Sequence, residues 1–525
     1  MLIAKAVDSL AARSLVRSLN DDSVSLANAL VREVIIRHAG PIRIRQIHLQ
    51  VANALAALGE APQKIVAHLV SAGDSGRAYA HALTAAESSE RLFAFTDAAY
   101  YLKLAYENAP NVVDKLSVGK RCVRTLIHLR QVAEATDLLG DMVVACGDAG
   151  SSLEIEALRL RLECYGRSDD SARLLQRTRQ LLASPNAFEN GNVTAECIDV
   201  LGLLAYECGN LAAAEEAIGL LDDLQRHSGD RHANNRAAAV RALLLGLFVD
   251  IDEAIHCAAT AVENSRIIGN AEVGIAAMIA LGDVYVYAGR LAGASECYAM
   301  ADECARSVGA IAFLPRLYHN RAIVALEAGV LDDALQLLGR ASEASGDAAM
   351  ATGFSALALA NIHWERGNGD LARTAALEVL DARTEIPWWS RVVAHAFCGL
   401  VELEHGHLAT ASSHRTAILE QLEEVDFVFG DLSYPEILIA RVATVEGRRS
   451  EAVARLARVI DAYGNREECC RIRLMVERAR LLVPVDPAAA LGVALEARRR
   501  AEVAGAGLSR ERADAIVRRI ASAMA

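Results

Sequence analysis

The sequence predicts an all-α fold, a solenoid of about 11 stacked helix pairs. A small residue recurs roughly every 40 residues, and a regular period of this length is typical of stacked helical repeats. The chain also has 53% hydrophobic but only 5% aromatic residues, and nine prolines in 525, which suits long helices that cross closely. The recurring small residues are Ala98, Ala135, Ala172, Ala214, Ala254, Ala294, Ala334, Ala372, Ala411 and Ala452, with Ala489 as an eleventh candidate.

Charge and hydropathy limit the classes of partner. A net charge of −13 and a pI near 5.6 disfavour a nucleic-acid partner or a membrane surface, because phosphate binding needs concentrated positive charge. The longest apolar runs, such as residues 242–249, are far shorter than the roughly 18 residues that cross a bilayer. Eleven scattered cysteines without a CxxC pair indicate reduced thiols, so we expect a cytoplasmic protein.

Residues 1–58 do not follow the repeat. Their pattern predicts a helix over 9–18, a turn at 20–22, a strand over 23–26, and helices over 29–38 and 42–57 that are separated by a Gly-Pro break. This order is the second half of a winged helix, so we expect a partial winged-helix or hinge segment. Contact of residues 1–40 with DNA is the less favoured alternative.

Residues 59–507 carry the repeats, and the clearest copy is LGDVYVYAGRLAGASECYAMA, residues 281–301. Gly282 and Ala294 let two antiparallel helices approach, Tyr298 fills the space between neighbouring pairs, and Gly289 favours a left-handed turn that ends the first helix. This spacing resembles that of tetratricopeptide repeats, which implies a right-handed superhelix. The period exceeds the usual length of about 34 residues, and the longer unit resembles the repeat domain of bacterial regulators of the MalT and LuxR type.

The C-terminal segment, residues 508–525, reads LSRERADAIVRRIASAMA. It is too short for a LuxR-type helix-turn-helix domain. We expect a C-terminal capping helix, because the last unit of a solenoid needs a polar outer face.

No catalytic motif is recognisable. The one Gly-Lys pair, Gly119-Lys120, lacks both the first glycine and the final hydroxyl of a P-loop. The densest histidine group, His395, His405, His407 and His414, offers no convergent set of ligands, so we interpret it as solvated turn histidines rather than a metal site. We therefore expect no catalytic residue, no metal and no cofactor. A hydrolase with an unrecognised site near His405 is the least favoured alternative.

In tetratricopeptide arrays the first helix of each pair lines the concave surface, and the resemblance therefore implies where a partner binds. Aromatic and hydrogen-bonding side chains in this register are typical of a binding groove. Trp364, one of three tryptophans, is the strongest single candidate, although partly buried packing explains it equally well. The groove candidates are Tyr206, Asp283, Tyr287, Arg316, His319, Asn361, Trp364, Glu365, Glu404 and Arg441.

The junction between residues 29 and 90 suggests a regulatory role. The segment ALVREVIIRH, followed by RIRQIHLQVANALAALG and AHLVSAGDSGRAYAHALTAAE, closely resembles the junction of winged helix and repeats in signal-transduction ATPases with numerous domains. This resemblance implies a non-enzymatic sensor arm that binds a protein, a peptide or a small-molecule inducer and works with an ATPase domain in trans. A freestanding tetratricopeptide adaptor is the alternative. We expect no nucleic acid and no membrane as partners.

Overall fold

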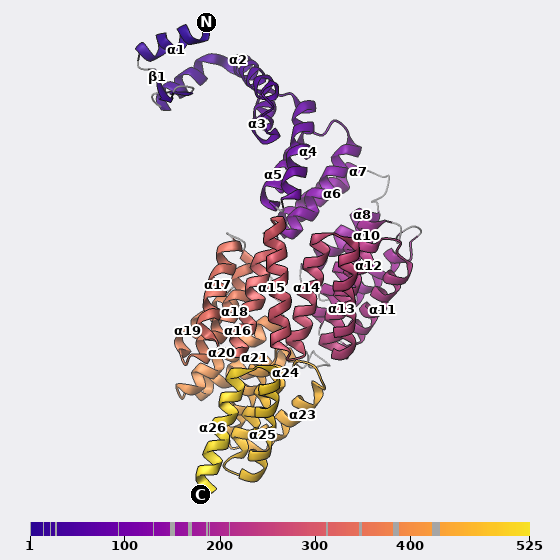
Figure 1. Ribbon diagram of the computed structural model, residues 1–525, viewed down its shortest axis with the longest axis vertical. Helices are drawn as coiled ribbons and strands as arrows, with labels where there is room; N and C mark the ends of the chain where they lie inside the picture. Colours follow the sequence, from indigo (N-terminus) through magenta and orange to yellow (C-terminus); the bar gives the residue numbers. More distant parts are fainter. Residues whose placement is uncertain are drawn as a thin grey trace. The chain divides into compact units, whose positions relative to one another are not determined.

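We describe the protein from a computed structural model, shown along the chain in Figure 1. The structure describes residues 2–13, 15–20, 23–26, 29–92, 94–129, 131–146, 153–165, 171–184, 187, 190–208, 211–310, 313–345, 349–381, 388–422 and 431–524. The chain divides into two compact units. Unit 1 contains residues 1–91 and 95–125, and unit 2 contains residues 92–94 and 126–525.

Unit 1 begins with a helix and a β-hairpin. Helix α1 spans Leu2–Ala12, and strand β1, Val16–Asn20, pairs antiparallel with strand β2, Ser23–Leu26. The strand predicted over 23–26 is confirmed, but the helix predicted over 9–18 is wrong. Helix α1 ends at Ala12 because the backbone of Val16–Asn20 makes ladder bonds to β2, and such pairing overrides a weak local helix preference. The predicted turn at 20–22 falls mostly on residues 21 and 22, which lie outside the described residues.

The remainder of unit 1 is helical. Helix α2, Ala29–Ala57, contains the predicted break, because Gly40 has φ 71° and ψ 156° and is followed by Pro41. The next helices are α3 Pro62–Ala72, α4 Ser75–Arg91, α5 Phe95–Glu107 and α6 Val112–His128. The core between α2, α3 and α4 is made by Ala52, Ile65, Leu69 and Ala78.

Unit 2 is a superhelical solenoid of antiparallel helix pairs, as the repeat predicts. From α8 to α25, each even-numbered helix is the first of its pair and the next odd-numbered helix is the second. Helix α26 follows the last pair and contains the residues expected to form a capping helix, up to Met524. The helices of unit 2 are α7 Val132–Cys146, α8 Leu153–Tyr165, α9 Ser171–Leu182, α10 Gly191–Cys208, α11 Leu211–His227, α12 Arg231–Leu244, the π-helical turn η2 Leu245–Val249, α13 Ile251–Ile268, α14 Ala271–Tyr287, α15 Leu291–Val308, α16 Leu314–Ala328, α17 Leu331–Ser345, α18 Ala349–Glu365, α19 Gly369–Leu380, α20 Trp388–Glu404, α21 Leu408–Leu422, α22 Ser433–Val445, α23 Arg449–Ala462, α24 Glu468–Leu482, α25 Pro487–Ala504 and α26 Gly507–Met524.

The pair α14/α15 shows why small residues are needed. A Cβ on Gly282 would lie 2.4 Å from the ring of Tyr298, whose side chain is fully buried between the helices. Gly289 ends the first helix with φ 65°, the left-handed conformation that its position predicts. In α25 the predicted residue Ala489 is only half-buried, and the fully buried small residue is its neighbour Ala490.

The C-terminal helices of unit 2 return to earlier pairs. Helix α24 contacts α14, and α26 contacts α16 (Figure 1). One hydrophobic core contains Ile275 and Leu317 together with Ile472 and Ala501. At Gly507 the approach is so close that a Cβ would lie 2.2 Å from the carbonyl oxygen of Ala328. The array therefore closes on itself, and pairs that are distant in sequence share one core.

Candidate binding surface on the first helices

The first helices of unit 2 lie on its inner side. Each first helix from α8 to α24 contacts the next one, and α24 contacts α26. Among the described second helices, a comparable contact joins α9 and α11. In a curved stack the helices on the inner side come closest together, so the contacts place the even-numbered helices there. Most of the side chains considered below belong to these helices.

Asp283 of α14 is the centre of one polar cluster on this side. Its carboxylate accepts hydrogen bonds from the Tyr298 hydroxyl at 2.6 Å and from the Asn320 amide at 2.7 Å, and it pairs with the Arg316 guanidinium at 2.8 Å. Asp283 itself is only 9% exposed. The three donors compensate the free-energy cost of burying the Asp283 carboxylate, so this carboxylate holds the side chains of its partners in place.

Arg316 and His319 of α16 lie one turn apart on the same face. The Arg316 side chain is 57% exposed even though Asp283 fixes its guanidinium. Burial and the charge of Arg316 lower the pKa of His319 to about 4, so this half-buried imidazole is neutral near pH 7. Tyr287, at the end of α14, packs against the core around Ile251 and Ala254. This part of the surface thus presents one fixed, accessible arginine beside a neutral imidazole.

A second charged group lies on α8, α10 and α12, and its residues are not among the predicted groove candidates. Arg161 pairs with Glu196 at 2.7 Å and with Asp199 at 2.8 Å, and Asp199 also pairs with Arg236 at 2.5 Å. Arg161 and Glu196 are buried, whereas the side chain of Arg236 is 39% exposed. The arrangement repeats that at Asp283, because an aspartate holds an accessible arginine.

The spacing of the repeat predicts two members of this group. Arg316 precedes the buried Ala334 by the same number of positions as Arg236 precedes Ala254. Glu196 stands at this same distance before Ala214. Counting back from these alanines therefore selects Glu196 and Arg236, but not Arg161 or Asp199.

Asn361 and Glu365 of α18 are engaged inside the protein. The hydroxyl of Tyr434, from α22, lies 2.6 Å from Oδ1 of Asn361 and 2.6 Å from Oε1 of Glu365. Glu365 also pairs with Arg512 of α26 at 2.6 Å. Trp364 lies between them in sequence and packs, partly buried, against the core around Phe397. These predicted groove residues connect α18 to the C-terminal helices.

Arg473 of α24 strengthens that connection. Its guanidinium lies over the ring of Tyr434, 4.7 Å from the centroid, and pairs with Glu327 of α16 and with Asp431 at 3.2 Å. Burial raises the pKa of Glu327, and the charge of Arg473 opposes this effect. The inner side between α16 and α24 is therefore filled by the protein's own side chains.

The remaining groove candidates differ in their surroundings. Glu404, at the end of α20, is exposed. Arg441 of α22 makes a two-pronged pair with Glu477 at 3.0 and 3.1 Å and is partly exposed. The side chain of Tyr206 lies outside the described residues, although its backbone is part of α10.

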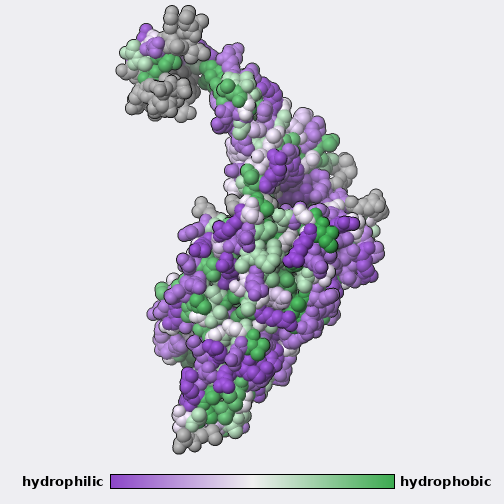
Figure 2. Space-filling view, viewed as in Figure 1, coloured by the Kyte–Doolittle hydropathy of each residue, from purple (hydrophilic) through white to green (hydrophobic). Residues whose placement is uncertain are grey.

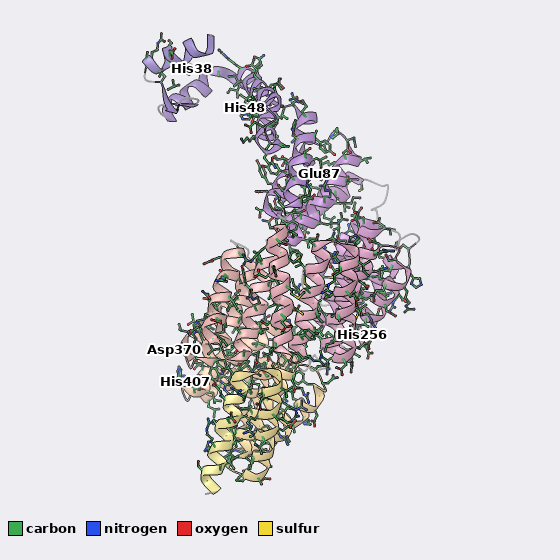
Figure 3. All side chains as sticks on the ribbon, viewed as in Figure 1. His38, His48, Glu87, His256, Asp370 and His407 are labelled. Atoms are coloured by element: carbon green, nitrogen blue, oxygen red, sulfur yellow. The ribbon has the colours of Figure 1, made fainter. Side chains whose placement is uncertain are left out.

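The histidine group does not form one cluster. His395 and His414 are half-buried and face each other with their Nδ1 atoms 3.0 Å apart. His405 and His407 are exposed in the turn before α21, and Figure 3 labels His407. His407 lies 2.7 Å from Glu402. Within the described part of the chain, no three His, Cys, Asp or Glu side chains come together as metal ligands. None of the described helices is both long and apolar enough to span a membrane.

No protein-family model matches the chain, and no curated protein aligns with it significantly. Several solved structures of helical repeat proteins are similar. One is the Cut9–Hcn1 hetero-tetramer of the APC/C, with TM-score 0.47, 13% identity, and coverage of 94% of this chain and 92% of that chain. Another is the apo form of the quorum sensor NprR from B. thuringiensis, with TM-score 0.37, 16% identity, and coverage of 59% and 93%.

A third similar structure is the signal-transduction ATPase with numerous domains and a tetratricopeptide repeat sensor from Pyrococcus horikoshii. It has a TM-score of 0.36 and 14% identity. The match covers 85% of this chain but only 60% of that chain.

Proposed function

We propose that this protein is a non-enzymatic scaffold whose first helices bind a protein or peptide partner. The observation that supports this most strongly is the repeated aspartate–arginine arrangement. Arg236 and Arg316 lie at equivalent positions two repeats apart, and each is accessible while an aspartate fixes its guanidinium. An arginine that is already oriented loses little conformational entropy when it binds a carboxylate, which favours acidic groups on the partner.

The binding region of this proposal is the inner side of α8 to α16. On α18 and α24, by contrast, the side chains of Asn361, Glu365 and Arg473 are used in contacts with other helices of unit 2. A partner that bound there would have to replace these buried contacts, and breaking a buried ion pair costs several kcal/mol, roughly 3–5. The side chains of Arg236 and Arg316 are 39% and 57% exposed, so a partner reaches them without replacing a buried ion pair.

The test is affinity capture from lysate of the source organism with the full chain. We compare the wild type with the variant Arg236→Ala/Arg316→Ala. The control variant is Arg179→Ala/Arg226→Ala, because these arginines are exposed and paired with carboxylates but lie on the second helices α9 and α11. A protein that the wild type and the control capture, and the inner-side variant does not, supports the proposal. Identical capture by all three proteins contradicts it.

The sensor arm of a signal-transduction ATPase is the more specific form of the proposal, and a freestanding adaptor is the alternative. The first rests on the resemblance of residues 29–90 to the winged-helix and repeat junction of such ATPases. The two differ in their partners. Capture of a P-loop ATPase, in an amount that changes with added ATP, supports the sensor arm. Capture of other proteins without any ATPase supports the adaptor.

A further inference from the structure

Charge is distributed unevenly along the chain. Residues 441–525 contain 17 arginines and 11 acidic side chains, a net charge of +6, in a protein whose total is −13. The rest of the chain therefore carries −19. We call residues 441–525 the cationic end. Such a separation of charge creates a local positive potential on an acidic protein.

Ion pairs inside the cationic end do not cancel this charge. Three of its glutamates each pair with two arginines: Glu468 with Arg471 and Arg500, Glu477 with Arg441 and Arg480, and Glu496 with Arg499 and Arg500. On α26, Arg510, Arg518 and Arg519 are exposed and have no ion-pair partner among the described residues. Arg455, Arg473 and Arg512 are paired with Glu436, Glu327 and Glu365, which lie outside the cationic end. The exposed positive charge on α26 is therefore that of Arg510, Arg518 and Arg519.

The outward face of α25 adds exposed apolar side chains to these arginines. Ala490, Ala494 and Ala497 are buried on one side of the helix. The opposite side carries Leu495, Arg499 and Val503, each four positions after the one before, so they lie in one row. Leu495 is 40% exposed, the Arg499 side chain 62% and Val503 79%. Arg498 and Glu502 lie beside this row and are also exposed.

Figure 2 shows hydrophobic and hydrophilic side chains next to each other at the C-terminal end of the chain. Leu495 and Val503 lie in one row with Arg499, so a partner that covers these two apolar side chains also meets the positive charge of the arginine. A nucleic-acid backbone would neutralise the arginines, but phosphate contacts leave apolar side chains uncovered. An acidic protein segment with its own apolar residues would pair with the arginines and would also cover the exposed aliphatic side chains.

We propose that the outward face of α25, with the neighbouring arginines of α26, is a docking surface for an acidic, amphipathic protein segment. Carboxylates of the segment would pair with Arg498, Arg499 and Arg518, and its apolar side chains would cover Leu495 and Val503. This surface belongs to the second helix of the last pair. It is therefore distinct from the inner surface at Arg236 and Arg316.

Fluorescence anisotropy with the full chain tests the proposal. The probe is a labelled synthetic peptide, long enough for several helical turns, with Glu and Leu at helical spacing. The comparison probes are a poly-glutamate peptide with the same number of carboxylates and a short DNA duplex of similar length. We expect the Glu-Leu peptide to bind at least about tenfold more tightly than poly-glutamate, because burying two aliphatic side chains adds more than about 1.4 kcal/mol.

Two variants and two matched controls separate the contributions. We expect Leu495→Gln/Val503→Ser to weaken the Glu-Leu peptide about tenfold, and Arg498→Glu/Arg499→Glu to remove most of the salt dependence of its binding. The apolar control is Val330→Ser/Val445→Ser, at residues exposed by 47% and 59% on other helix pairs, and the charge control is Arg179→Glu/Arg226→Glu. Thermal unfolding checks that all variants are folded.

The same assay contains the outcomes that overturn the proposal. If the variants and their controls lose equal affinity for the Glu-Leu peptide, the binding is general electrostatic attraction and not docking on α25. Tighter binding of the duplex than of the Glu-Leu peptide, unaffected by Leu495→Gln/Val503→Ser, would instead assign the face to nucleic acid. The variant Arg236→Ala/Arg316→Ala should bind the peptide like the wild type, so failure here and failure of the proposed function can be told apart.

Discussion

The Asp283 carboxylate lies 2.8 Å from the Arg316 guanidinium, across the contact between α14 and α16. The acid is buried and the base is mostly exposed, so the two residues make different contributions. Asp283 holds the side chains of Tyr298, Arg316 and Asn320, whereas Arg316 presents a charge to solvent on the inner side of the array. This asymmetry leads to opposite expectations for the two residues in stability and in binding.

The first prediction concerns stability at this pair. Asp283→Asn weakens the pair with Arg316 and the bonds from Tyr298 and Asn320, so we expect the free energy of unfolding to fall by about 1–3 kcal/mol. Arg316→Gln should cost less than about 1 kcal/mol, because exposed ion pairs contribute little. Urea unfolding measures both values. A larger loss for Arg316→Gln than for Asp283→Asn would contradict this assignment of roles.

The second prediction concerns the close helix crossing at Gly282. Tyr298 cannot move away from an added methyl group, because its ring is buried and its hydroxyl is bonded to Asp283. Gly282→Ala should therefore destabilise the protein by about 1–3 kcal/mol. Gly339 of α17 is exposed and would meet nothing within 4 Å, so Gly339→Ala should stabilise by about 0.5–1 kcal/mol. Equal effects in urea unfolding would contradict the packing explanation.

The third prediction is loss of stability in acid at the pair His395 and His414. Burial lowers both pKa values, with the charge of the partner and of Arg391 adding to the effect at His395, whose pKa is about 4. The folded state therefore resists protonation. Stability is fully present above the ordinary pKa of 6.5 and is lost as the pH falls toward 4.

We expect His395→Gln/His414→Gln to reduce the fall in Tm between pH 7 and pH 4.5, compared with the wild type. His256, which is exposed on α13 (Figure 3), is the control. The substitution His256→Gln should leave the pH profile unchanged. If the Tm of His395→Gln/His414→Gln falls as much between pH 7 and pH 4.5 as that of the wild type, other groups cause the acid sensitivity.

The fourth prediction concerns Glu467, which precedes α24 with φ 49°. Burial, and secondarily the charge of Asp431, raise its pKa to about 8, while Cys470 and Arg466 act in the opposite direction. The folded state binds this proton more tightly than the unfolded state does. Stability therefore falls as the pH rises from about 4.5 to about 8.

Glu467→Gln should remove this loss, so its Tm relative to the wild type should increase between pH 6 and pH 8.5. Glu511→Gln, at an exposed position on α26, is the control. A constant Tm difference across this range would contradict a protonated Glu467.

The sequence predicts the repeat architecture well because it depends on local geometry. Gly282, Gly289 and the buried alanines satisfy steric requirements that recur at a similar distance from pair to pair. The sequence pattern predicts β2 but not β1, Val16–Asn20, because strand pairing is decided by a partner segment and not by the local pattern.

The inner surface is only partly predictable from sequence. The register places Asn361 and Glu365 on the first helix α18, but it does not show that the hydroxyl of Tyr434, far along the chain on α22, bonds to both side chains. That contact arises because the array closes on itself, which brings distant pairs together. The same register does identify Arg236, because its distance from the buried alanine equals that of Arg316.

In the proposed function, accessible arginines on the first helices hold the partner. The most direct measurement is the Kd of the captured partner for the wild type, for Arg236→Ala/Arg316→Ala, and for Arg179→Ala/Arg226→Ala. We predict at least about a tenfold increase in Kd for the inner-side variant, because two oriented charged contacts are lost, and no change for the control. Equal Kd values for the inner-side variant and the wild type would contradict the claim.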